Sequence, residues 1–143
     1  MAEVTYNRGA TRILAGDTPL DSADLRMLLI AGASLPAGWN NPDLNTLAEL
    51  DAVTDVVFHS ERIALLSKTV TQDDTNNRAN ADSAAVAFAA APGVTARAAI
   101  IYDEGGGTDA TRYLISGHGT GFPQPLDGGL NVPIADWLRG IAG

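Results

Sequence analysis

Short apolar segments separated by turn-forming residues recur along the whole chain, at intervals of about ten residues. The chain has 143 residues, of which 15 are Gly and 7 are Pro, the residue types that turns favour. This pattern predicts a mainly β fold, a β-sandwich or barrel of short antiparallel strands with one or two short helices near the N-terminus. The length is that of an ordinary domain, so we expect one β-rich domain over residues 1–143.

Two segments have the features of short helices. Residues 6–15 are followed by Gly16, a common helix stop, and residues 42–50 begin with Pro42 after a potential cap at Asn41. The segments that are predicted to be strands are residues 25–32, 53–57, 62–70, 78–82, 95–102 and 112–117. Pro133 predicts an edge strand or an irregular end for the last segment.

The longest polar stretch lies between two of these strands. Residues 72–80 contain a single apolar residue, Ala79, and are rich in Asp, Asn and Thr, whose side chains hydrogen-bond to their own backbone in turns. Polar and apolar residues alternate from Arg78 onward, as in a half-exposed strand. The stretch is therefore predicted to be an ordered hairpin that stays ordered without added calcium, and not a linker.

The acidic residues of this region do not form a calcium loop of the EF-hand type. Counted from Asp74, the sixth and twelfth positions are Ala79 and Ala85, where that loop needs Gly and Glu. Two other sets of acids remain candidates for a cation site. They are Asp73, Asp74 and Asp82, and Asp103, Glu104 and Asp109. Solvated turns are the simpler interpretation, so no metal site and no cofactor are predicted.

Several other classes of function are disfavoured by composition and motif. The net charge of −8 opposes nucleic-acid binding, and the absence of Cys excludes zinc-thiolate sites and Cys nucleophiles. The glycine-rich segments 105–111 and 117–121 lack the residues of a P-loop or a Rossmann motif. The longest apolar run, residues 27–33, is far below the roughly 18 residues of a membrane span. We expect a soluble protein made in the cytoplasm, without a signal peptide.

No catalytic residues are predicted. His59 and His118 are the only histidines, and Ser60 and Ser116 lie near them, but the Gly-x-Ser-x-Gly motif is absent. An enzyme remains an alternative only if one of these histidines lies in a cleft with an acid and a Ser. The aromatic residues that could form a sugar-binding platform, if exposed, are Trp39, Tyr102, Tyr113, Phe122 and Trp137. Core packing is the commoner role of such residues.

Four blocks of the sequence resemble a family of small tailed-bacteriophage virion proteins. The chain has the Thr-Val-Thr-x-Asp-Asp-Thr-x-x-Arg-Ala hairpin at 69–79, a strand that ends in Ile-Tyr before an acidic loop at 100–111, Leu114-Ile115, and Trp137 with Gly140-Ile141. The resemblance covers most of the chain and is most specific over residues 66–116. Residues 122–129, rich in Gly and Pro, and Pro133 depart from the family pattern.

The resemblance implies a non-enzymatic virion structural protein. The specific expectation is a decoration (cement or minor capsid) protein that binds the major capsid protein at the outer surface of the shell as a homotrimer. It would be located in the virion and bind no nucleic acid or membrane. The candidate contact residues are Gln72, Asp73, Asp74, Thr75, Asn76, Asn77, Arg78 and Arg112. The alternatives are a tail, head-to-tail connector or fibre-attachment protein, and a carbohydrate-binding module that aids adhesion to host or mucus.

Overall fold

The computed structural model describes residues 3–133 and 138–141 of the chain, and it confirms the mainly β fold. The two helices are α1 (Asn7–Leu14) and α2 (Leu47–Asp51). The strands are β1 (Glu3–Thr5), β2 (Leu25–Ala31), β3 (Val57–Phe58), β4 (Ile63–Ala64), β5 (Thr69–Asp73), β6 (Arg78–Asp82), β7 (Val86–Phe88), β8 (Thr95–Ala96), β9 (Ala98–Asp103), β10 (Tyr113–His118), β11 (Gln124–Pro125), β12 (Leu130–Val132) and β13 (Leu138–Ile141).

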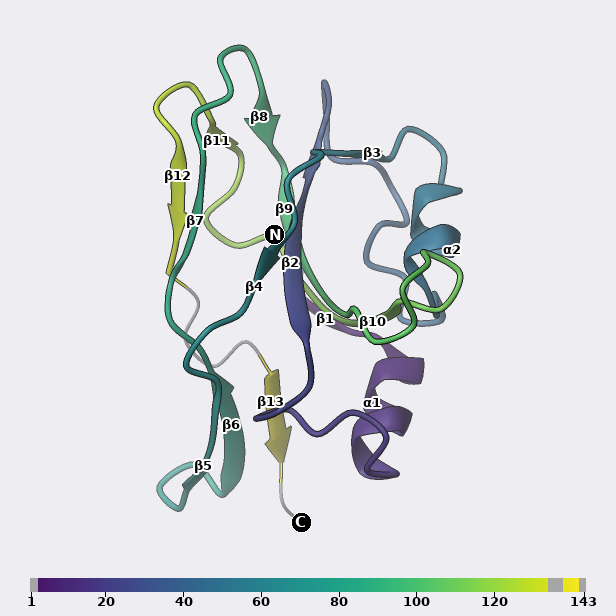
Figure 1. The fold of residues 1–143 in the computed structure, drawn as a ribbon, viewed down its shortest axis with the longest axis vertical. Helices are drawn as coiled ribbons and strands as arrows, with labels where there is room; N and C mark the ends of the chain where they lie inside the picture. The colour runs from purple at the N-terminus through teal and green to yellow at the C-terminus, as the bar shows by residue number, and fades with distance from the viewer. Residues whose placement is uncertain (1–2, 134–137, 142–143) are drawn as a thin grey trace.

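An antiparallel sheet forms the centre of the molecule (Figure 1). Its strand order is β1-β10-β9-β2-β3, and β4 pairs with the other end of β2. Every residue of β9 is buried, and so is every residue of β2 except Arg26. Both strands are continuous apolar runs because both faces of this sheet are covered.

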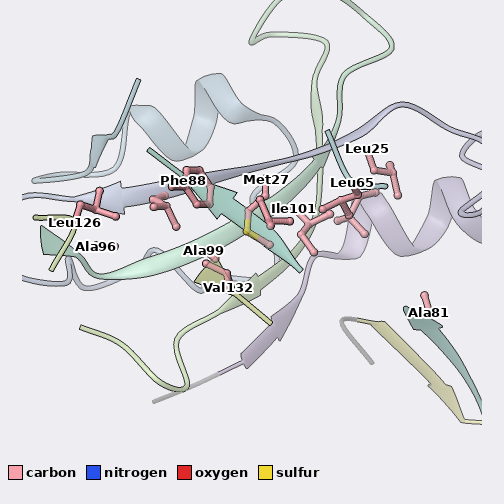
Figure 2. Packing of buried hydrophobic residues seen from close by; sticks show 13 residues of the cluster. Leu25, Met27, Leu65, Ala81, Phe88, Ala96, Ala99, Ile101, Leu126 and Val132 are labelled. Atoms are coloured by element: carbon pink, nitrogen blue, oxygen red, sulfur yellow. The ribbon is translucent and has the colours of Figure 1, made fainter. Parts of the chain in front are cut away.

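Alternate residues of the central strands enter two separate cores. Met27 and Leu29 of β2 face one core, together with Ile101 of β9, and this core is completed by side chains from β7, β8 and β12 (Figure 2). Leu28 and Ile30 face the other core, which α2 and the loop that carries Trp39 cover. The central sheet therefore lies between a layer of short strand pairs and a layer of helix and loop (Figure 1).

A second, three-stranded sheet has the order β13-β6-β5. We call it the ribbon, and we call the central sheet with its two covering layers the body. The ribbon lies at one end of the molecule (Figure 1), and Ala81 of β6 is at the margin of the core side chains (Figure 2). The predicted hairpin at residues 72–80 is confirmed as the β5–β6 pair.

Several predicted boundaries are wrong. The second helix begins at Leu47, not at residue 42, because Thr46 and Glu49 form a capping box while the Asn41 side chain accepts from the Asp43 amide in a turn. Of the strand predicted at 53–57, only Val57 lies in a strand, β3, and Asp55 has a φ of 69°. The strand predicted at 62–70 is divided into β4 and β5, and Ser67 between them has a φ of 54°.

The predicted strand 95–102 is divided at Arg97 into β8 and β9, which belong to different sheets. Gln124 and Pro125 form a short strand, β11, which was not among the predicted strands and lies in the segment 122–129 that is rich in Gly and Pro. β12 ends directly before Pro133, and Trp137 lies outside the described residues. No helix in the described part of the chain is long and apolar enough to cross a membrane.

Candidate functional site

The hairpin that carries most of the predicted contact residues closes its own turn. Asp73 pairs with Arg78 in the ladder, and residues 74–77 form the turn. The Asp73 carboxylate accepts hydrogen bonds from the Asn76 amide, at 3.2 Å, and from the Asn76 side chain, at 2.8 Å. Gln72 donates a further hydrogen bond to Asp74. These local bonds give the turn a defined shape.

Most residues of the hairpin turn are exposed to solvent. Gln72 and residues 74–77 are exposed, and Asp73 is half-buried. Val70 of β5 is 51% exposed and Leu66, just before the strand, is 67% exposed. β5 is an edge strand, and within the described residues its outer edge pairs with no other strand. Such an edge presents unpaired N–H and C=O groups to any partner that can add a strand.

Arg112, the eighth predicted contact residue, lies elsewhere. It precedes β10 beside α2, whereas the hairpin lies at the far end of the molecule (Figure 1). Its guanidinium donates to Glu104 at 2.6 Å and to Asp109 at 2.8 Å, and Arg62 donates to the same Asp109 oxygen at 2.9 Å. The structure thus does not bring Arg112 into the hairpin surface.

The ion pairs around Arg112 hold the loop between β9 and β10. Hydrogen bonds from Arg62, and then from Arg112, keep the pKa of the Asp109 carboxyl below its usual value. Burial, followed by the nearby Glu104 charge, raises the pKa of Tyr102 to about 12. Asp109 also has its backbone carbonyl bonded to the Ala48 amide of α2. The cluster therefore fixes the loop against α2.

The second set of acids considered as cation ligands, Asp103, Glu104 and Asp109, is bonded to other groups of the protein. Asp103 accepts from the Thr18 hydroxyl at 2.7 Å and from the Gly105 amide at 2.9 Å, and Arg12 lies 3.7 Å away. Glu104 and Asp109 are paired with Arg112. Across residues 3–133 and 138–141 there is no group of three or more His, Cys, Asp or Glu placed to hold a metal ion.

His118 joins a serine and an acid in one chain of contacts. Its Nε2 is 2.9 Å from Ser116 Oγ, and its Nδ1 is 2.5 Å from Glu3 Oε2. Ser116 and His118 are two residues apart on β10, so their side chains share a face. Glu3 is directly opposite His118 on β1. Its other carboxylate oxygen accepts from the Thr120 amide at 3.1 Å.

This order of contacts is that of a serine-hydrolase triad, but the serine is inaccessible. Ser116 is 1% exposed and is paired between Thr5 of β1 and Ile101 of β9. Two surface clefts, one beside Arg97 and one beside Tyr113, are lined by other residues and include none of these three. In this arrangement the three side chains fasten the N-terminal strand to β10, which the sequence analysis did not foresee because Glu3 and His118 are 115 residues apart.

The electrostatics of this group follow from burial. Desolvation lowers the pKa of His118 below 6.5, although the adjacent Glu3 carboxylate acts in the opposite direction. Burial alone raises the pKa of Glu3, but the hydrogen bond from Thr120 and the contact with His118 outweigh it and lower the pKa overall. His118 is thus held in its neutral form at neutral pH.

The aromatic residues in the described part of the chain do not form an exposed aromatic platform. Trp39 is 4% exposed and packs in the second core with Tyr102. Tyr113 lies under the guanidinium groups of Arg8 and Arg12, whose carbons are 5.5 and 4.4 Å from the ring centre. Phe122 is half-buried against the first core. Because Trp39 is buried, it cannot form an exposed pair with another aromatic residue.

Comparison of the chain with protein-family models, with curated proteins and with solved structures finds no match. Function is therefore inferred from the geometry of the residues and from the resemblance of the sequence blocks.

Proposed function

We propose that the chain is a non-enzymatic structural protein of a tailed-bacteriophage virion. Within the particle, we propose a decoration (cement or minor capsid) protein that binds the major capsid protein at the outer surface of the shell and stabilises it. The single observation that carries this proposal is the ribbon, a β-sheet exposed at its turn and along its outer strand.

The ribbon suits a contact with another protein. Its outer strand, β5, begins Thr-Val-Thr, has a high β-propensity and contains no Pro. Proteins usually protect such an edge with short strands, charged side chains or a covering segment. Here the only charged residue of β5 is Asp73, at its end. The strand therefore offers main-chain hydrogen bonds for affinity and the side chains of Val70 and the turn for specificity.

The charge of the molecule fits a place on the outside of a shell. The net charge is −8, and Arg12, Arg26, Arg62 and Arg112 are paired with acids of the same chain. The protein thus repels the phosphate backbone of DNA and stays dispersed at high local copy number. A homotrimer follows from the three-fold sites that an icosahedral shell presents, since symmetry matching is common in assemblies.

Cryo-electron microscopy of the particle made by the source of this gene tests the proposal. We expect density for this chain at three-fold or quasi-three-fold positions of the shell, with residues 72–78 at the contact. Density restricted to the neck or tail would reassign the chain to a connector or fibre-attachment role. Absence from the particle would contradict a virion role altogether.

A binding assay with shells that lack the protein tests the ribbon itself. Val70→Asp places a charge on the outer strand and should abolish attachment to the shell. Val57→Asp is the matched control, because Val57 is 53% exposed on β3, an edge strand of the central sheet. We expect the control to bind as the unmodified protein does, and equal binding by both variants would place the contact elsewhere.

A further inference from the structure

A cleft of about 630 Å³ lies beside β3 and β8, at the end of the molecule opposite the ribbon, where Figure 1 shows these two strands. It is lined by residues 31–33 after β2, residues 57–60 at β3, residues 93–95 at the start of β8, and Arg97. The cleft is independent of the ribbon and of the role proposed for the chain in the virion.

Arg97 is held rigidly at this cleft. Its backbone amide bonds to the Ile30 carbonyl at 2.6 Å, its Nε donates to the Gly32 carbonyl at 3.1 Å, and its Nη2 donates to the Ala33 carbonyl at 2.8 Å. Nη1 makes no hydrogen bond within the described residues. A fixed guanidinium loses little conformational entropy when it binds a ligand.

Arg97 also differs from most of the other arginines of the body in its electrostatic surroundings, Arg8 being the other one without a carboxylate partner within the described residues. Arg12, Arg62 and Arg112 each form an ion pair with a carboxylate. Arg97 has no carboxylate partner within the described residues and is bonded only to carbonyl groups. The net charge of the chain is −8. Arg97 nevertheless places a fixed positive charge at this cleft, and the outer edge of its guanidinium group is open.

Other polar groups of the cleft have hydrogen-bonding capacity that is not used. In the described part of the chain, the His59 ring, the Ser60 hydroxyl and the Thr95 hydroxyl make no side-chain hydrogen bond. Apolar surface from Phe58 and Val94 lies among them. A charged fork, neutral donors and acceptors, and an apolar face together are the features of a site for a small polar ligand.

We infer that this cleft binds the carboxylate of an acidic sugar, such as a uronic acid. The open edge of the Arg97 guanidinium matches a carboxylate in two-point geometry. His59, Ser60 and Thr95 are suited to sugar hydroxyl groups, and Phe58 to the apolar face of the ring. A polyanion such as nucleic acid is disfavoured, because the net negative charge of the protein repels it.

Titration of the full-length, ¹⁵N-labelled protein with glucuronic acid, followed by NMR, tests the assignment. We expect saturable shifts of the Gly32, His59 and Arg97 amides, with a Kd on the order of 1 mM, since a single sugar has few atoms with which to bind. Glucose, which lacks the carboxylate, should bind at least roughly tenfold more weakly. Equal binding of glucose, or no saturable shift, would overturn the inference.

Variants separate a specific site from a general attraction of anions. Arg97→Gln should weaken glucuronic acid binding roughly tenfold or more. Arg8→Gln is the matched control, because Arg8 has no carboxylate partner within the described residues and lies at a different cleft. Equal losses in both variants would show a long-range charge effect and would contradict the site.

Arg97→Gln also removes the hydrogen bonds from Arg97 to the carbonyl groups of Gly32 and Ala33, so it alters the loop as well as the binding group. A second variant that keeps these hydrogen bonds is therefore needed. His59→Ala leaves Arg97 and its carbonyl partners in place, and we expect a smaller but measurable loss of affinity. An unchanged affinity in His59→Ala would contradict the placement of the sugar. A short DNA duplex that shifts the same amides as strongly as glucuronic acid would overturn the choice of ligand class.

Discussion

The body and the ribbon are built from similar short strands but differ in how their faces are used. In the body, β2 and β9 are covered on both faces and supply two cores. In the ribbon, residues 69–72 of β5 are all exposed, so neither face of that stretch is covered by the chain itself. A strand that is β-branched and uncovered obtains little stability from its own molecule.

This difference separates folding from assembly. The body contains the apolar burial that stabilises the chain, about 25 cal/mol for each Å² removed from water. Among the ribbon residues whose burial the structure describes, only Ala81 belongs to the first core. Changes in the body are therefore expected to alter the free energy of unfolding, and changes in the ribbon to alter binding.

The largest expected effect is a cavity in the central sheet. Ile100→Ala removes a buried side chain of β9 from the second core and should lower the free energy of unfolding by about 3 kcal/mol. The Tm should fall by about 10 °C. Val70→Ala in β5 should change stability by less than about 0.5 kcal/mol. Similar losses in urea denaturation of the two variants would remove the distinction between body and ribbon.

The next largest loss of stability is expected from a substitution of Gly9 in α1. A Cβ at Gly9 would lie 2.2 Å from the Leu114 carbonyl oxygen and 2.9 Å from the Ile115 Cα, so α1 approaches β10 too closely for any side chain. Gly9→Ala should destabilise the protein by about 2 kcal/mol, as overpacking does, despite the better helix propensity of Ala.

Gly128→Ala is the control for this change, because a Cβ there meets no heavy atom within 4 Å. Thermal denaturation should show a Tm close to that of the unmodified protein. A Gly9→Ala variant that is as stable as this control would contradict the close packing of α1 on β10.

Acidification should weaken the fastening of β1. Because the pKa of His118 is lowered below 6.5 in the folded chain, the unfolded chain binds a proton more readily as the pH falls from about 7.5 to 5.5. Stability therefore falls with the pH across this window. The lowered pKa of Glu3 adds a further loss below its ordinary value of 4.5.

His118→Gln tests the origin of this pH dependence. Denaturation curves of the variant should change less between pH 7.5 and 5.5 than those of the unmodified protein. An unchanged slope would assign the dependence to other groups.

The smallest effect on stability is expected in the turn of the ribbon. Replacing residues 74–77 by the two-residue turn Asn-Gly shortens the hairpin but leaves both cores intact. The Tm should stay within about 2 °C of the unmodified protein, while attachment to the shell is lost. Loss of stability on the scale of Ile100→Ala would show that the turn belongs to the folding unit.

The sequence predicted the parts of the fold that depend on neighbours in the chain. The β5–β6 and β9–β10 hairpins follow from alternation and turn residues within about 20 positions. The start of α2 was misplaced because Asn41-Pro42 and Thr46 are both good starting signals, and the capping box with Glu49 decides between them. The division at Arg97 depends on bonds to a loop 65 residues away.

Prediction of the candidate sites from the sequence has the same limit, because it finds residues that are neighbours in the chain. The polar turn was found because its residues are consecutive, and Asp73 indeed closes it. The sequence alone does not show that Arg112 forms ion pairs within its own chain. Its contacts with Glu104 and Asp109 depend on the conformation of the loop between β9 and β10. The Glu3–His118 contact and the Arg97 cleft join distant segments, and no local pattern indicates them.

Hydrogen exchange of the ribbon, in the isolated protein and on the particle, tests the central claim most directly. In the isolated protein, we expect the outward-facing amides of Thr69–Asp73 to exchange rapidly while those of β2 and β9 are protected. On the particle, the same β5 amides should become protected, because a partner covers the edge. β5 amides that exchange equally fast in both states would contradict the assignment of the ribbon as the contact surface.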